Sequence, residues 1–190
     1  MKSLKYLLFY LLITFIMTNC IKVHTENGNN PSKETEWKSE FKEQLSLFGH
    51  RNWILVVDKA FPAQNAEGII TLDTGKDLLD VLSCVMEEID NSTHVKPIVY
   101  KDKELDYIKK DQITGIDNYR KSLNSAIGKY KPQVLLHDSV FGKIDEASKL
   151  FNVMVLKTNM VIPYSSVFIE LDCKYWTGDK EEALRESMKK

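Results

Sequence analysis

Four short polar segments of this sequence contain residues that can transfer a proton or bind a hydroxyl group, and each lies at the end of an expected strand. They are Gly49-His50, residues 58–63 (DKAFPA), His137-Asp138 and residues 163–166 (PYSS). A histidine gains or loses a proton near neutral pH, and an ionised carboxylate accepts hydrogen bonds through both oxygens. Taken singly, each segment is better explained without a function, as a surface or core histidine, a turn or a helix cap. A functional site requires that several of them converge in the fold.

The elements that must position these segments are predicted from the periodicity of apolar residues. Residues 53–57 (WILVV) form a continuous apolar run, which is typical of a strand covered on both faces, and residues 77–89 have the spacing of an amphipathic helix. Further strands are expected at 95–100, 133–136, 153–156 and 167–171, and further helices at 34–48, 118–127, 144–151 and after Trp176. A loop is expected between Asp58 and the helix at 77–89.

The alternation of strands and helices predicts the fold class. It indicates a single α/β domain with a largely parallel sheet covered by helices. In such sheets ligands bind at the carboxyl ends of the strands. Asp58 and the residues after Leu136 are therefore candidate site residues from their position alone.

Several kinds of site are excluded by the sequence. Gly75-Lys76 lacks the first glycine and the final Ser or Thr of a phosphate-binding loop. No Cys or His cluster has the spacing of metal ligands, so no metal is expected. Cys84 and Cys173 are expected to be small buried side chains rather than a disulfide framework. Basic and acidic residues are interleaved, which argues against a nucleic-acid partner.

The N-terminal segment has the pattern of a secretory signal. Lys2 and Lys5 precede an apolar run over residues 6–17 that ends just before Cys20. A membrane-spanning helix needs roughly 20 apolar residues, so residues 1–19 are predicted to be a signal peptide that is removed. Cys20 is the expected lipidation site, although Met17 and Asn19 depart from the usual lipobox. The alternative is ordinary secretion with Cys20 incidental.

The rest of the chain divides at residue 34. Residues 20–33 are predicted to be the lipidated cysteine and a flexible tether, since Asn-Gly and Asn-Pro interrupt a polar stretch without apolar periodicity. Residues 34–190 have the length of one domain. Removing Lys2 and Lys5 with the leader leaves 24 basic and 27 acidic residues, a net charge of −3. The expected location is the periplasmic or cell-surface side of a membrane, held there by the lipid.

Two segments together resemble the ribose pyranase / fucose mutarotase (RbsD/FucU) family. Gly49-His50, seven intervening residues, Asp58 and then Phe61-Pro62 are similar to the family's N-terminal signature. Residues 164–167 (YSSV) fall where the family has a Tyr-small-Asn-Ile segment. The resemblance covers most of residues 45–175.

The resemblance implies a cofactor-independent isomerase that interconverts the ring forms of a free monosaccharide. His50 would be the catalytic acid–base residue and Asp58 would bind sugar hydroxyls. The remaining implied substrate-binding residues are His137, Tyr164, Ser165 and Ser166. Ser166 stands in place of the family's Asn. Counting back from Tyr164 puts the family's middle His or Arg near Val140, whose side chain cannot perform that role. The role is therefore assigned to His137, one helical turn earlier. The resemblance also implies a homo-oligomeric ring whose pocket is completed by a neighbouring subunit.

Two other functions remain open at this point. A non-catalytic, monosaccharide-binding lipoprotein linked to sugar uptake would keep the pocket without the chemistry. A purely structural assembly protein would leave His50, Asp58 and Tyr164 scattered in space. Convergence of these three side chains in the fold would favour a sugar site over a purely structural protein.

Overall fold

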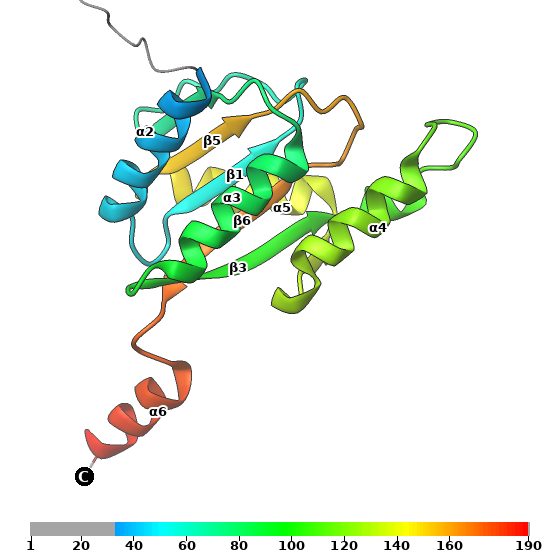
Figure 1. Ribbon diagram of the computed structural model, residues 1–190. Helices are drawn as coiled ribbons and strands as arrows, with labels where there is room; N and C mark the ends of the chain where they lie inside the picture. The colour runs from blue at the N-terminus through cyan, green and yellow to red at the C-terminus, as the bar shows by residue number, and fades with distance from the viewer. Residues whose placement is uncertain (1–32, 190) are drawn as a thin grey trace, which may run out of the picture. The chain divides into compact units, whose positions relative to one another are not determined.

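A mixed six-stranded sheet in the order β2-β5-β1-β6-β3-β4 lies at the centre of the computed structural model, which describes residues 33–189 (Figure 1). The strands are β1 (Trp53–Val57), β2 (Ile69–Asp73), β3 (Val95–Asp102), β4 (Gln133–Leu135), β5 (Val153–Lys157) and β6 (Val167–Cys173). The helices are α2 (Lys33–Leu47), α3 (Leu78–Asn91), α4 (Ile116–Ile127), α5 (His137–Ser148) and α6 (Gly178–Ser187), with short 3-10 turns η1 (Lys103–Tyr107) and η2 (Gly128–Tyr130).

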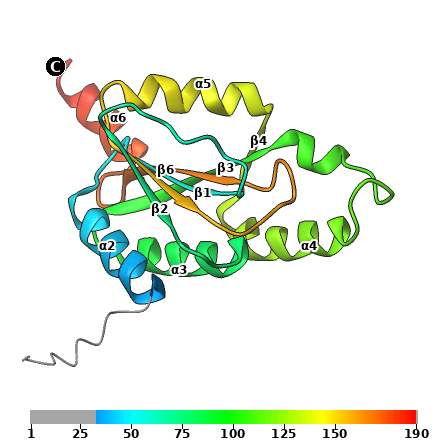
Figure 2. The ribbon, with the colours of Figure 1, turned by 90° about the horizontal axis from the view of Figure 1, so that it is seen from above.

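Helices cover both faces of the sheet, because the side chains of its central strands alternate between two cores. Ile54 and Val56 of β1 belong to a core built with α2, α3 and α4. Trp53, Leu55 and Val57 belong to a second core, which α5 covers. Figure 2 shows the resulting layers, with α5 on one side of the sheet and α2, α3 and α4 on the other. The fold class predicted from the sequence is confirmed.

Strand β6 lies between β1 and β3 and is antiparallel to both, whereas β2, β5 and β1 are parallel neighbours, as are β3 and β4. Val167, the first residue of β6, pairs with Val56 on one side and with Lys101 on the other. The start of β6 therefore lies at the same edge of the sheet as the carboxyl ends of β1 and β3. This register brings three distant segments of the chain together.

Two predicted elements differ from the structure. The segment after Asp58 contains the strand β2, which was expected to be loop; its residues are only partly buried at the edge of the sheet, so they give no strong apolar signal. Helix α5 begins at His137 rather than at residue 144 and ends at Ser148 rather than at residue 151. Its first apolar contacts, made by Val140, precede the expected start.

The predicted signal peptide, the lipidation site Cys20 and nearly all of the tether lie outside the described residues. Between residues 33 and 189, no helix has both the length and the apolar character needed to cross a bilayer. Cys84 and Cys173 are free thiols and are half-buried rather than fully buried. Helix α6 contributes no buried residue.

Candidate functional site

Asp58 and Ser166 form a hydrogen-bonded pair where β1 ends and β6 begins. The Asp58 amide donates to the Ser166 Oγ (3.2 Å), and the Ser166 hydroxyl donates to Asp58 Oδ1 (3.0 Å). Asp58 Oδ2 accepts from the amide of Ala60 (3.3 Å), so both carboxylate oxygens are held in place. A carboxylate oxygen has more than one lone pair. Asp58 can therefore still accept hydrogen bonds from a bound hydroxyl.

His137 is the first residue of α5 and is fixed by two carboxylates from the end of β3 and from η1. Its main-chain amide donates to both oxygens of Glu104 (3.1 Å each). Glu104 thus caps the N-terminus of α5, where a negative charge is favourable. The imidazole Nδ1 lies 2.9 Å from Oδ2 of Asp102. With the proton on Nδ1 donated to Asp102, Nε2 of a neutral His137 is left as a proton acceptor.

Asp102 is a fully buried carboxyl group (0% exposed) at the last position of β3. Its Oδ2 contacts His137, and its Oδ1 is buried without a hydrogen-bond partner among the described residues. Burial raises the pKa of Asp102 to about 6; the bond to His137 opposes this shift, and the carboxylates of Glu104 and Asp58 add to it. A buried carboxyl group with one unpartnered oxygen is rare in folded proteins and is typical of functional sites.

Aromatic rings surround the imidazole of His137. The ring of Tyr164 meets it edge to face with centroids 5.3 Å apart, and Phe141 lies 4.4 Å away on the next turn of α5. Phe61 packs on Phe141 at 5.5 Å. Tyr164 has a φ of 58°, in the left-handed region that few non-glycine residues adopt; Arg51 and Lys131 are the others in the described residues. This backbone conformation lies just before the start of β6, at the edge occupied by His137.

Four predicted site residues lie at the same edge of the sheet, in two contacting pairs: Asp58 with Ser166, and His137 with Tyr164. Ser165 lies within the same segment, but its hydroxyl donates to the carbonyl of Ile162 (2.6 Å) and its own carbonyl accepts from the Tyr119 hydroxyl (2.7 Å). Its side chain is fully buried. Ser165 therefore holds the segment in place.

His50 lies at the opposite edge of the sheet, in the turn before β1. The five buried residues of β1 separate it from Asp58, which is about 17 Å of extended chain. Its Nδ1 contacts Asp172 (3.2 Å), and its Nε2 accepts from Nε of Arg51 (2.9 Å). Within one chain, the structure does not bring His50 to the other four residues.

Asp102 and Glu104 are the site residues that the sequence did not indicate. The strand was expected to end at residue 100, and the following residues, Lys101 to Glu104, have the charged character of a surface turn. The pairing of Lys101 with Val167 on one side, and of Lys101 and Asp102 with Val134 and Leu135 on the other, extends β3 as far as Asp102. The sequence contains one signal for these site residues: charged residues directly follow a buried strand.

The fold is similar to that of two solved structures. One is the structure of Bacillus subtilis RbsD complexed with D-ribose, with a TM-score of 0.51, 20% identity, and coverage of 70% of this chain and 92% of that one. The other is the crystal structure of the fucose mutarotase from Streptococcus pneumoniae in complex with L-fucose, with a TM-score of 0.50, 13% identity, and coverage of 76% and 97%. No protein-family model and no curated protein sequence matches the chain. These structures confirm the fold that the resemblance implied.

Proposed function

We propose that this protein interconverts ring forms or anomers of a free monosaccharide by acid–base ring opening, without a cofactor. The observation that carries the proposal is the convergence of His137, its buried partner Asp102 and the hydroxyl-binding carboxylate Asp58 at one edge of the sheet. The two solved structures with this fold hold D-ribose and L-fucose, which supports a sugar as the ligand.

His137 is the acid–base group in this proposal. Opening a hemiacetal moves a proton from the anomeric hydroxyl to the ring oxygen while the bond between the anomeric carbon and the ring oxygen breaks, and closure reverses both changes. Nε2 of His137 takes the first proton, and the resulting imidazolium, paired with the Asp102 carboxylate, returns it to the ring oxygen. The half-exposed side chain (36%) is accessible to a ligand.

Asp58 and Tyr164 bind and orient the sugar. Asp58 accepts hydrogen bonds from hydroxyl groups, and Ser166 holds its carboxylate in position. The ring of Tyr164, packed against the imidazole, offers an apolar face to the C–H side of the sugar. The proposed proton transfer between two oxygens of the sugar uses only His137 and Asp102.

His50 takes part in this proposal only from another copy of the chain. It is exposed (54%) and lines an open hollow of about 490 Å³ together with residues of α5. A ring of copies, which the sequence resemblance implies, would place the His50 of one subunit beside the His137 site of the next. Light scattering at micromolar concentration tests the assembly. Mixing the inactive variants His50→Ala and His137→Gln tests the sharing, because only a shared site regains activity on mixing.

The decisive measurement is saturation-transfer NMR of ring-form exchange on ribose, fucose, galactose, xylose and rhamnose. Wild type is expected to accelerate at least one of them, and His137→Gln to lower that rate by about 10²–10⁴-fold. His94→Gln is the matched control, because His94 is also half-buried but bonds only to the carbonyls of Leu45 and Phe48. Equal rates for wild type and His137→Gln would refute the assignment of His137.

A non-catalytic sugar-binding protein is the second candidate. It is favoured by Ser166, which stands where the resembling family has an asparagine and whose hydroxyl is already bonded to Asp58. Binding of a sugar without accelerated exchange, in the same NMR experiment, would establish this alternative in place of the enzyme.

A further inference from the structure

A second hollow adjoins the candidate site. It has a volume of about 500 Å³, within the range of roughly 300–1,000 Å³ usual for small-molecule sites. Its lining residues are Lys103, Glu104, Tyr107, Ile108, Gln112 and Leu136. Glu104 is shared with the site, because its carboxylate caps His137, and Leu136 directly precedes His137. The hollow therefore adjoins the first residue of α5.

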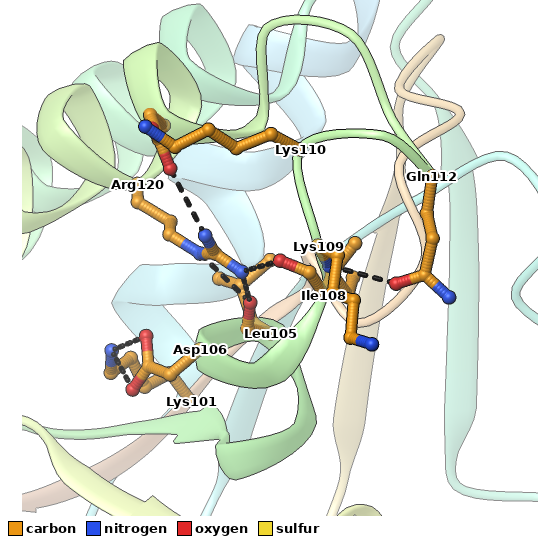
Figure 3. A network of polar contacts seen from close by, with 9 residues as sticks. Lys101, Leu105, Asp106, Ile108, Lys109, Lys110, Gln112 and Arg120 are labelled. Carbon is orange, nitrogen blue, oxygen red and sulfur yellow. Dashed lines mark hydrogen bonds and ion pairs between the residues drawn. The ribbon is translucent and has the colours of Figure 1, made fainter.

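The segment that forms most of the hollow is held in a fixed conformation by Arg120 of α4 (Figure 3). The Arg120 guanidinium donates through Nε and Nη2 to the carbonyl of Leu105 (2.9 and 2.6 Å) and through Nη2 to the carbonyl of Ile108. At the rim, Oε1 of Gln112 accepts from the amide of Lys109 (2.7 Å). These bonds organise the hollow before any ligand arrives, which lowers the entropic cost of binding.

The chemistry of the hollow suits a neutral, hydroxylated ring. Tyr107 is 72% exposed and Leu136 is 55% exposed, which is unusual for large apolar side chains placed side by side. An exposed tyrosine offers its ring face to the C–H side of a sugar and its hydroxyl to hydrogen bonds. The ammonium of Lys103 and the carboxylate of Glu104 have opposite charges, so the hollow does not select an anion such as a sugar phosphate.

We propose that this hollow binds the second sugar ring of a reducing oligosaccharide whose first ring occupies the His137 site. The inference rests on the proposed function and extends its substrate from a free monosaccharide to the reducing end of an oligosaccharide. Ring opening takes place at the reducing end, and Tyr107 and Gln112 bind the neighbouring ring.

The test compares ring-form exchange for reducing disaccharides (maltose, cellobiose, lactose) with exchange for glucose, the sugar at the reducing end of each, using the full chain. For wild type, kcat/KM for at least one disaccharide is expected to exceed that for glucose about tenfold. Tyr107→Ala is expected to lower this disaccharide-to-monosaccharide ratio about tenfold. The matched control is Leu47→Ala, since Leu47 is 74% exposed and lies at the end of α2, on the opposite face of the sheet from α5. This variant is expected to keep the wild-type ratio.

An unchanged disaccharide-to-monosaccharide ratio in Tyr107→Ala would overturn the inference. If the oligomeric state measured by light scattering changes while this ratio does not, the hollow is an interface between copies. If neither disaccharides nor glucose show accelerated exchange, the proposed function fails. Sugar binding then decides whether the hollow is a sugar site. Saturation-transfer difference signals from the non-reducing ring of a disaccharide that disappear in Tyr107→Ala would still support the hollow as a sugar site. Equal signals would refute it.

Discussion

Replacing Asp102 with asparagine is expected to damage the site but to change the pH dependence of stability. Relative to wild type, the free energy of unfolding of the variant should be higher above pH 6 than at pH 4. Burial raises the pKa of this carboxyl group from 3.8 to about 6. Each pKa unit corresponds to about 1.4 kcal/mol, so the shift amounts to about 3 kcal/mol. Asparagine keeps the shape of the side chain and an oxygen that can accept from His137, but it has no charge to bury.

The direction of the effect follows from the number of protons bound in each state. Between pH 4 and 6 the unfolded chain loses the Asp102 proton while the folded protein keeps it, so the free energy of unfolding of the wild type falls as the pH rises. Above pH 6 the folded protein also ionises and the loss is complete. The free energy of unfolding of Asp102→Asn, minus that of wild type, should therefore increase by about 3 kcal/mol from pH 4 to pH 7.

Urea denaturation followed by tryptophan fluorescence measures this difference, because Trp37 and Trp53 are buried. The matched control is Asp172→Asn at the opposite edge of the sheet. Partial burial tends to raise the pKa of Asp172, but Lys96, His50 and a main-chain amide outweigh it and hold the pKa below its usual value. The pH dependence of Asp172 therefore falls below about pH 4, and the control difference should stay nearly constant between pH 4 and 7. A flat difference for Asp102→Asn between pH 4 and 7 would refute the claim that the fold contains a desolvated carboxyl group here.

Two further predictions concern contacts of the site, and a third concerns the N-terminal segment. Ser166→Ala removes the hydrogen bond that orients the Asp58 carboxylate and should weaken sugar binding in a titration. The loss should be smaller than the roughly 1.5–3 kcal/mol that a hydrogen bond to a charged group contributes, because this bond exists in the free and the bound protein alike; unchanged affinity would show that Asp58 needs no such support. Glu104→Gln removes the charge at the N-terminus of α5 and should lower the free energy of unfolding by about 0.3–1 kcal/mol, with the loss shrinking in high salt. Cys20→Ala should release the protein from membranes, and mass spectrometry of the wild type should find lipid on an N-terminal Cys20; an unmodified N-terminus elsewhere would rule the anchor out.

The sequence predicted the central strands well because their residues are apolar on both faces. All five residues of β1 are buried, so the run from Trp53 to Val57 contains no polar residue and predicts a strand clearly. β2 was missed because an edge strand buries little and its stability comes from pairing with β5, which lies about eighty residues later in the chain. The start of α5 was missed because its cap, Glu104, is contributed by a distant segment.

The candidate site was predictable in its parts but not in its grouping. Asp58, His137 and Tyr164 were expected from their positions and from the resemblance, and the register of β6 brings them together. The seven residues between His50 and Asp58 include the whole of β1, so this spacing places the two side chains at opposite edges of the sheet. Asp102 could not be identified, because nothing in a run of charged residues distinguishes the one that becomes buried.

The position of β6 has a consequence for how the chain folds. β6 is the last strand to be synthesised, yet it lies between β1 and β3, and without it the sheet would consist of the separate sets β2-β5-β1 and β3-β4. Its pairings join residues more than sixty positions apart in the chain, and contacts of such long range form slowly. The edge that carries Asp58 and Asp102 is therefore assembled late, when the last strand inserts. Until then two half-sheets each expose an unpaired edge that can pair with another chain, so the unfinished domain is most prone to aggregation at that stage.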